Sequence, residues 1–276
     1  MSYTTIIDAN DKRLKLGIRE LFQYRDLFWI LAYRDYRIRY AQTFLGFGWA
    51  FLQPFITLVI FILVFGKAAK VDTGTVPYPV FAIVGQSAWT YFAFVMSQSG
   101  GSIIGAQNMV KKIYFPRLII PLSKAVVGFV DYGIAFLMMI ILMVYYQFVP
   151  NTQIIFLPIF ILLTIISALA VGIWLSTLTI RYRDFKHIIP FMVQFGLYAS
   201  PVGYPAELVI KNAPDWVSYL YFLNPMAGII EGYRWCILGA APPGILSYIS
   251  FSVVIVLFIS GLFYFKRVER IMADIV

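Results

Sequence analysis

The chain has 276 residues, of which 61% are hydrophobic, 18% are aromatic and only 13% are charged. Soluble domains carry about 25% charged residues, so this composition excludes an ordinary soluble domain and predicts an all-α integral membrane protein. The formal net charge of +9 comes from lysines and arginines that flank the apolar runs, and we expect no nucleic acid partner. The single cysteine, Cys236, excludes an internal disulfide and is expected to pack in the interior.

Residues 1–46 form a polar, charged N-terminal segment ahead of the first apolar run, which is the wrong order for a cleaved signal peptide. Within this segment, apolar side chains recur at helical spacing and predict an amphipathic helix (Ile18, Leu21, Phe22, Phe28, Trp29 and Ala32). Two explanations remain open for this helix. Either it lies in the headgroup plane and contacts membrane lipids, or it packs as a soluble helix on a partner protein.

A helix needs about 20 apolar residues to cross the hydrocarbon core of a bilayer. Five runs satisfy this requirement, namely 47–66, 80–100, 125–146, 154–180 and 245–265. A sixth run, 190–206, is shorter and is interrupted by Pro201 and Pro205, but an even number of spans is needed if both termini share a side. We therefore predict a transmembrane domain of six helices over residues 47–265, followed by a cytoplasmic tail, 266–276.

The distribution of basic residues predicts which side the termini occupy. With both termini inside, 18 of the 22 lysine and arginine residues lie on the cytoplasmic side. They fall in the N-terminal segment, in the tail and in two loops, 101–124 and 181–189. Because positive charge is retained in the cytoplasm, we expect a multi-pass protein with both termini cytoplasmic.

The external segment 207–244, between the fifth and sixth predicted spans, contains the apolar pieces WVSYLYFL and NPMAGIIEGYRWCILG. Each piece is too short to cross a membrane. Asn224 is a helix N-cap residue, Pro225 suits the first helical position, and Gly239 is placed to end the second piece. We predict two short re-entrant helices here, which cap or line a cavity.

The sequence lacks the motifs of a nucleotide-binding or metal-dependent enzyme. Gly66 and Lys67 are followed by Ala68, and Phe61 stands where a phosphate loop would need its first glycine. The only histidine is His187, and no paired-aspartate, zinc-protease or Ser/His/Asp motif occurs. We expect a transport subunit that is not itself an enzyme and that binds no cofactor or metal directly.

Asp131 lies about six residues inside the third predicted span. A carboxylate at this depth is a candidate for a role in transport. The alternative is that it pairs with a loop cation or with a neighbouring serine or tyrosine.

Several stretches, taken together, resemble the membrane (permease) subunit of ABC-2-type exporters of bacterial polysaccharides. The resemblance covers about residues 34–240, and its most specific parts are the motifs Y-F-P-R, R-Y-R-D and N-P-M-x-G-x-I-E. It rests on RYAQTFLGFGWAFLQPF (39–55), YPVFAIVGQSAWTYF (78–92), NMVKKIYFPRLIIPLSKAVVGFVDY (108–132), RYRDFKHIIPFMVQFGLYASPVGYP (181–205) and YFLNPMAGIIEGYRWCILG (221–239).

The resemblance implies a homodimer joined to two copies of a separate ABC ATPase subunit, which binds ATP and magnesium. The implied cargo is a polyprenyl-diphosphate-linked polysaccharide, moved outward across the bacterial cytoplasmic (inner) membrane. O antigen, a part of lipopolysaccharide, is the favoured cargo, and capsule, teichoic acid, lipid or drug export are the alternatives. An ion-coupled secondary transporter and a membrane-embedded glycan-processing enzyme are rival functions from other classes.

The resemblance also gives roles to cytoplasmic residues. The stretch 107–117 resembles the family's coupling helix, which docks on the ATPase, with Pro116 and Pro121 ending that helix and starting the next span. A second contact is expected from the loop after the fourth span. The residues concerned are Lys111, Lys112, Tyr114 and Arg117 in the first loop, and Arg181, Arg183, Asp184 and Lys186 in the second. The alternative is that these cations only hold lipid headgroups.

A sugar polymer needs contacts that can form again at each residue, and aromatic faces stack on sugar rings without reading individual hydroxyls. We predict that aromatic residues of the first, second and fifth spans line the channel: Trp49, Phe55, Phe81, Trp89, Phe92, Phe191, Phe195 and Tyr198. The alternative is that these rings face lipid. The external hairpin is expected to form a gate through Asn224, Pro225, Glu231 and Arg234, although Glu231 and Arg234 could be an ordinary pair on a helix surface.

Overall fold

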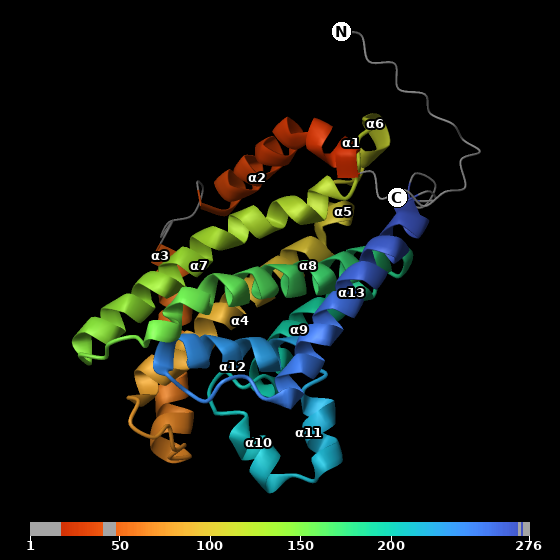
Figure 1. The fold of residues 1–276 in the computed structure, drawn as a ribbon. Coiled ribbons are helices and arrows are strands. Elements are labelled where there is room, and N and C mark those ends of the chain that lie inside the picture. Colours follow the sequence, from red (N-terminus) through yellow and green to blue (C-terminus); the bar gives the residue numbers. More distant parts are fainter. Residues whose placement is uncertain (1–17, 41–47, 270–271, 273–276) are drawn as a thin grey trace.

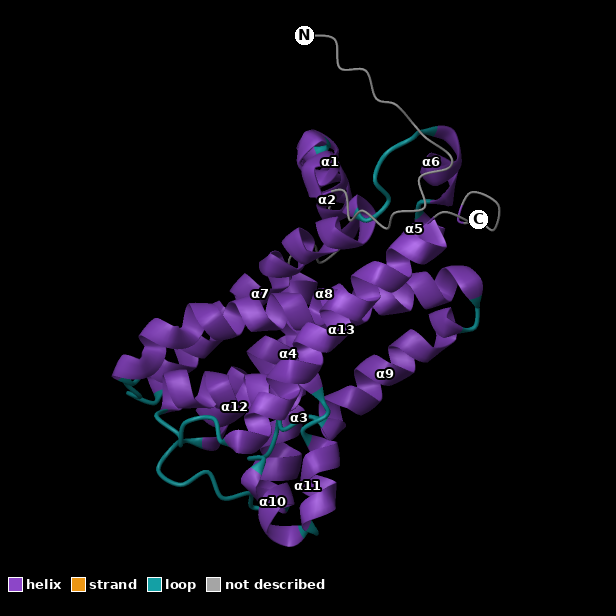
Figure 2. Ribbon diagram, turned by 45° about the vertical axis from the view of Figure 1, so that its right-hand side comes forward, coloured by secondary structure: helices purple, strands orange, loops and turns teal. Residues whose placement is uncertain are grey.

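The computed structural model describes residues 18–40, 48–269 and 272. Every regular element in these residues is a helix (Figures 1 and 2), which confirms the predicted all-α fold. Five of the elements are long and apolar enough to cross a membrane. They correspond to the five long apolar runs of the sequence, although the third begins at Ile119 rather than at residue 125.

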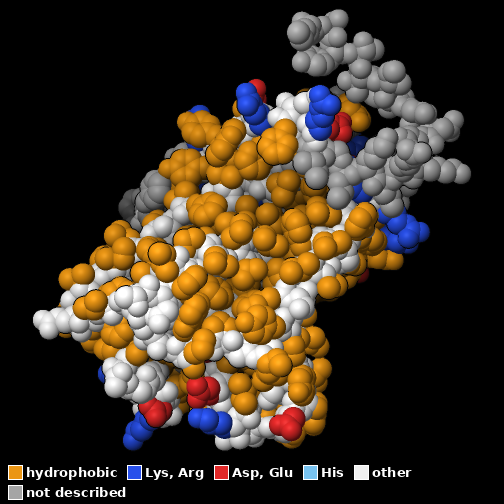
Figure 3. Space-filling view, in the orientation of Figure 1, with side chains coloured by type: hydrophobic (Ala, Val, Ile, Leu, Met, Phe, Trp, Pro, Cys, Tyr) orange, Lys and Arg blue, Asp and Glu red, His pale blue; other side chains and the backbone are white. Residues whose placement is uncertain are grey.

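The first long element is α3 (Gly48–Phe61), continued by the π-helical η1 (Ile62–Ala68). The next two are α4 (Tyr78–Gly100) and α7 (Ile119–Tyr145). The fourth combines the short 3-10 helix η2 (Thr152–Phe156) with α8 (Leu157–Arg181). The fifth is α13 (Ile245–Glu269). Hydrophobic side chains cover the body of the molecule, whereas charged groups gather toward its two ends (Figure 3).

The sixth predicted span corresponds to α9 (Phe185–Ala199), which has 15 residues. At 1.5 Å per residue this helix is about 22 Å long, which is less than the thickness of the hydrocarbon core. The chain continues from Ser200 to Pro205 without regular helix, as the two prolines of this segment require. A sixth crossing by α9 and the following segment therefore stays a prediction.

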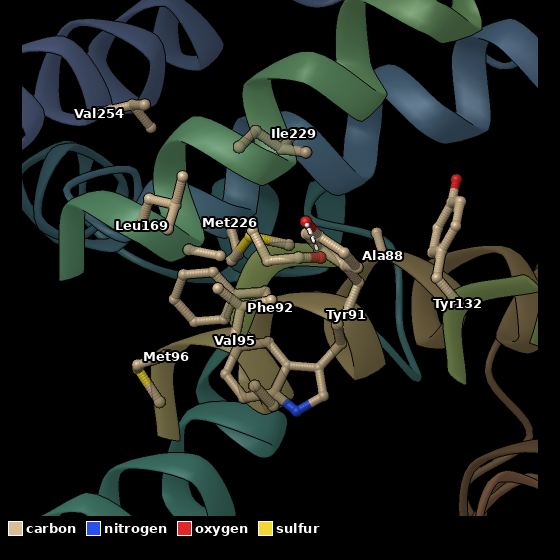
Figure 4. Close-up of a cluster of buried hydrophobic side chains, with 14 of the residues drawn as sticks. Ala88, Tyr91, Phe92, Val95, Met96, Tyr132, Leu169, Met226, Ile229 and Val254 are labelled. Carbon is tan, nitrogen blue, oxygen red and sulfur yellow. Dashed lines mark hydrogen bonds between the residues drawn. The ribbon is translucent and has the colours of Figure 1, made fainter. Parts of the chain in front are cut away.

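The helix α4 lies at the centre of the fold. In its most apolar stretch 83% of the residues are buried, against 22% for α3 and for α13. Small residues allow this close packing, since a Cβ atom on Gly85 would lie 2.9 Å from the carbonyl oxygen of Val202. Figure 4 shows part of the core around α4, where Phe92 and Met96 gather with Leu169 of α8 and Met226.

The N-terminal segment forms two helices, α1 (Ile18–Gln23) and α2 (Arg25–Tyr40), and α2 lies along α7 (Figure 1). The single apolar face that the sequence predicted is divided in the structure. Phe22 and Trp29 are exposed, whereas Ala32 is buried where α2 packs on the rest of the fold. This division arises because α7 covers part of the helix, which periodicity alone cannot show.

The segment 207–244, which was predicted to be external, contains three short helices rather than the predicted two: α10 (Glu207–Asn212), α11 (Asp215–Tyr221) and α12 (Pro225–Leu238). The prediction missed α10, a single short turn of helix supported by an i, i+4 ion pair between Glu207 and Lys211. The predicted ends of α12 are confirmed. The Asn224 side chain accepts a hydrogen bond from the Met226 N–H at 2.9 Å, and Gly239 ends the helix with a φ of +71°.

Candidate functional site

A cavity of about 420 Å³ lies between α3, α4 and α9. Polar side chains form much of its wall, which is uncommon between membrane helices because lipid cannot hydrogen-bond to them. The uncharged polar lining consists of Gln53, Thr57, Gln86, Thr90, Ser97, Gln98 and Gln194, and aromatic rings are supplied by Trp89 and Phe94. The cavity therefore combines hydrogen-bonding groups with flat apolar faces, the two features that a sugar chain can use.

One buried polar atom of the cavity wall, on Gln86, has no hydrogen-bond partner among the described residues. Its residue surface is only 2% exposed, and its Nε2 donates to the carbonyl oxygen of Pro54 at 2.7 Å. This bond fixes the orientation of the amide, so Oε1 is left without a partner among the described residues. A buried acceptor of this kind is normally paired, so a water molecule or a ligand hydroxyl is expected to reach it.

Arg39, at the end of α2, and Asp131 of α7 meet at one end of the cavity. The Arg39 guanidinium donates from Nη2 to Asp131 Oδ2 at 2.6 Å, and it lies over the ring of Phe94 at 4.3 Å. Tyr40 donates its hydroxyl to Asp131 Oδ1, also at 2.6 Å. Burial, with a smaller effect of the Asp131 hydrogen bond, raises the pKa of Tyr40, so the phenol stays protonated and able to donate.

These contacts bear on the pairing explanation for Asp131, and a role in transport stays a prediction. The pairing explanation is confirmed, since both carboxylate oxygens accept a hydrogen bond. The partner cation comes from the helix α2, however, and not from a loop. Because both oxygens of Asp131 are already hydrogen-bonded, these contacts within the fold are sufficient to stabilise a buried carboxylate at this position.

The predicted channel residues fall into two groups. Phe81, Trp89 and Phe92 of α4 are buried inside the subunit, with 6%, 5% and 4% exposure. Among these three, only Trp89 reaches the cavity wall. The rings on α3 and α9 are instead exposed: Trp49, Phe55, Phe191, Phe195 and Tyr198. Phe191 and Phe195 stack with their ring centroids 5.8 Å apart, which gives α9 a continuous aromatic face.

The predicted gate residues hold the segment that follows α9. Arg234 is buried, and its guanidinium donates to Glu231 at 2.7 Å and to the carbonyl oxygens of Tyr204 and Val202 at 3.1 and 3.0 Å. It also lies over the Phe81 ring at 3.9 Å. The alternative of an ordinary pair on a helix surface is therefore wrong.

Asn224 acts on the same segment, because its side-chain amide donates to Ser200 Oγ at 2.8 Å. Pro225 is the first residue of α12, so Asn224 is the residue that caps the helix directly before it. Together with Arg234, Asn224 joins the end of α9 to α12.

The predicted coupling helix over 107–117 is shorter than expected. The helix α6 covers only Gln107–Lys112, because Ile113 is extended and the chain then approaches Pro116. It follows a single turn, α5 (Ser102–Gly105). Lys111, Lys112 and Tyr114 are exposed, and the Tyr114 hydroxyl donates to Glu20 Oε1 at 3.4 Å.

Arg117 is engaged within the subunit. Its backbone N–H donates to Glu269 Oε1 at 2.9 Å, and its guanidinium donates to the Glu269 carbonyl oxygen at 3.0 Å. These bonds tie the loop to the end of α13. The second predicted contact lies between α8 and α9, near the C-terminal end of α13 in both views (Figures 1 and 2). Its charged residues are all exposed: Arg181, Arg183, Asp184 and Lys186.

The polar cavity residues Gln53, Gln86 and Gln194 were missed in the sequence, although glutamine inside an apolar run was an available signal. No group of three or more His, Cys, Asp or Glu side chains in the described part of the chain is arranged to hold a metal ion. Cys236 is free and buried, as expected.

The long apolar helices around a polar cavity define a polytopic membrane protein of the transporter type. Residues 26–238 match the family described as ABC-2 type transporter, and the chain belongs to this family. The resemblance stated from the sequence motifs is thereby confirmed.

Three curated relatives extend this result over almost the whole chain. The chain is 27% identical to the O-antigen export system permease protein RfbA of Myxococcus xanthus, over 79% of this chain and 82% of the relative. It is 26% identical to an RfbA of Klebsiella pneumoniae, over 95% and 98% of the two chains. It is 22% identical to the polysialic acid transport protein KpsM of Escherichia coli, over 88% and 94%.

Proposed function

We propose that the chain is the permease subunit of an ATP-driven exporter that moves a polyprenyl-diphosphate-linked polysaccharide, of the O-antigen type, outward across the bacterial cytoplasmic membrane. The observation that carries this proposal is the match with O-antigen export permeases over nearly the full length of both chains. The cavity supports it, since amide side chains and Trp89 offer hydrogen bonds and a stacking face inside the membrane region.

The route for the polymer is formed where two copies of the chain meet. The aromatic face of α9 and the exposed rings of α3 are the surfaces that a second copy would cover: Trp49, Phe55, Phe191, Phe195 and Tyr198. In a homodimer these rings would surround a shared passage. The buried Phe81 and Phe92 then support the wall of the passage, and Trp89 lies between the wall and the cavity.

The energy for transport comes from two copies of an ABC ATPase subunit, which hold ATP and magnesium. The exposed Lys111, Lys112 and Tyr114 dock on this partner, together with the loop between α8 and α9. Arg117 passes the movement of the docked loop to α13 through Glu269. This arrangement requires both termini to be cytoplasmic, with α9 and the segment after it as the sixth crossing.

Reconstitution in vesicles tests the proposal. Vesicles that hold the chain with its partner ATPase should move lipid-linked glycan only when ATP is supplied, and vesicles that hold the chain alone should move none. Glycan movement driven by an ion gradient, without the ATPase, would refute the proposal.

Two aromatic variants test the route. The variants Phe195→Ala and Tyr198→Ala should lower export several-fold while the ATPase still co-purifies, because both side chains are exposed and support little of the fold. Phe263→Ala is the matched control, since Phe263 is an exposed ring on a different helix, α13. Equal export by all three variants would remove the α9 rings from the route.

Capsular polysaccharide is the second candidate cargo, because KpsM is a polysialic acid transport protein. The vesicle assay separates the two candidates when it is run with O-antigen and capsule precursors in parallel.

A further inference from the structure

Two connected grooves lie beside Arg39, between α2, α4 and α7. Their volumes are about 270 Å³ and 410 Å³, and Asp35, Ile38, Gln98 and Lys124 line both of them. Arg39 lines the smaller groove and also the 420 Å³ cavity on its other side. It therefore stands where the grooves meet the cavity.

The grooves contain more positive than negative charge. The cations that line them are Arg34, Arg39 and Lys124, and the carboxylate is Asp35. Asp131, the ion-pair partner of Arg39, lines the neighbouring cavity and leaves one net positive charge when it is included. Both Asp35 oxygens are engaged, because Arg34 donates to Oδ1 at 2.8 Å and Lys124 bonds to Oδ2.

The two grooves contain more N–H hydrogen-bond donors than the oxygen acceptors of the protein can pair with. The oxygens of Asp131 are also taken, by Arg39 and Tyr40. Arg39 donates from Nη2 to Asp131 and also interacts with Tyr40, which leaves part of the five N–H donors of its guanidinium for a further acceptor. Lys124 makes one hydrogen bond with its three donors. One net positive charge and several open N–H donors thus face a groove that the protein does not fill.

Exposed rings near the grooves favour a position at the depth of a lipid headgroup. The helix α1 exposes Phe22, and α2 exposes Trp29 and Tyr33 one turn apart; side chains of this kind favour the boundary between headgroups and acyl chains. An excess positive charge at this boundary attracts the phosphate of a lipid. The planar Arg39 fork suits a phosphate in particular, because it can donate two parallel hydrogen bonds.

We propose that these grooves bind the phosphate or diphosphate headgroup of a lipid, with Arg39 and Lys124 as its main donors. Two lipids share this chemistry: the polyprenyl diphosphate that carries the cargo, and an anionic phospholipid of the bilayer. Binding of the polyprenyl diphosphate rests on the proposed function, and Arg39 would then hold this carrier lipid next to the cavity. Binding of an anionic phospholipid would instead fix α2 against the membrane surface.

Lipid binding to the purified transporter, complete with its ATPase, separates these sources. The probes are a polyprenyl diphosphate, the corresponding polyprenol without phosphate, and phosphatidylglycerol, with bound lipid counted by native mass spectrometry. The diphosphate should bind at least tenfold more tightly than the polyprenol. Competition by an equal concentration of phosphatidylglycerol assigns the site to bilayer lipid, and its absence assigns the site to the carrier. Equal binding of diphosphate and polyprenol overturns the proposal.

Variants locate the binding in the grooves. Arg39→Gln and Lys124→Gln should each weaken diphosphate binding about five- to tenfold. The matched control is Arg37→Gln, which removes the same charge from the same helix but lies outside the residues that line the grooves. It should change binding less than about twofold by the same reasoning.

Arg39→Gln removes the ion-pair partner of Asp131, so this variant could fail to fold. The variant Lys124→Gln then still tests the proposed site. In Lys124→Gln, Asp35 retains its bond with Arg34. Unchanged binding in Lys124→Gln overturns the site. Export by the wild-type protein still tests the proposed function in that case. A failure of the lipid-binding proposal can therefore be distinguished from a failure of the proposed function.

Discussion

Replacement of Asp131 by asparagine removes the negative charge of the ion pair between Arg39 and Asp131. Among the described residues, this ion pair is the only one that joins the Arg39 guanidinium to α7. The new side chain has nearly the same shape, and its oxygen can still accept the hydrogen bond of Tyr40. The guanidinium of Arg39, however, loses its counter-charge in a half-buried site beside Phe94. The change therefore tests how much this ion pair stabilises the position of α2 on α7.

The structure sets the expected size of the effect. Breaking a buried ion pair from one side costs about 3–5 kcal/mol. The Asp131 side chain is 6% exposed, but that of Arg39 is 32% exposed and can be partly solvated after the change. We therefore expect a loss of about 2 kcal/mol, close to the value of one charged hydrogen bond. This corresponds to a fall in Tm of about 4–8 °C for a chain of this size.

Thermal unfolding of the purified variant in detergent measures this loss. The double variant Asp131→Asn with Arg39→Gln should be less destabilised than the sum of the two single changes, because neither charge is then left alone. Export at a permissive temperature should be largely retained in Asp131→Asn. An unchanged Tm together with abolished export would refute the reasoning, since it would make Asp131 a transport group and not a structural partner.

Two further predictions concern packing and partner binding. Gly232→Ala should lower the Tm, because its Cβ would lie 1.9 Å from the Phe160 ring and force that ring to move, at a cost of about 1–3 kcal/mol or more. Gly133→Ala, which meets no atom within 4 Å, should leave the Tm unchanged or raise it slightly, and an equal fall in both variants would contradict the packing argument. Lys111→Glu should reduce the ATPase recovered by co-purification several-fold, whereas Lys211→Glu, in the short helix α10, should not. Equal recovery in these two variants would remove α6 from the docking surface.

Local features of the sequence were predicted reliably. Each of the five long spans is an apolar run whose length alone satisfies the thickness of a bilayer. The ends of α12 also follow from neighbouring residues, since Asn224 caps the helix, Pro225 begins it and Gly239 ends it. The helix α6 was predicted five residues too long, because Pro116 affects the backbone before it.

Contacts between distant residues were decided only by the tertiary structure. Arg39 and Asp131 are 92 positions apart, and the sequence identified Asp131 as unusual without naming its partner. Arg234 was expected at an external gate, but its burial on Phe81 and its bonds to Val202 and Tyr204 depend on how α4 and α12 pack. Apolar length, charge bias and helix capping are set by neighbours along the chain. The cavity, the grooves and the ion pairs exist only once separate helices meet, because each helix contributes a few of the required groups.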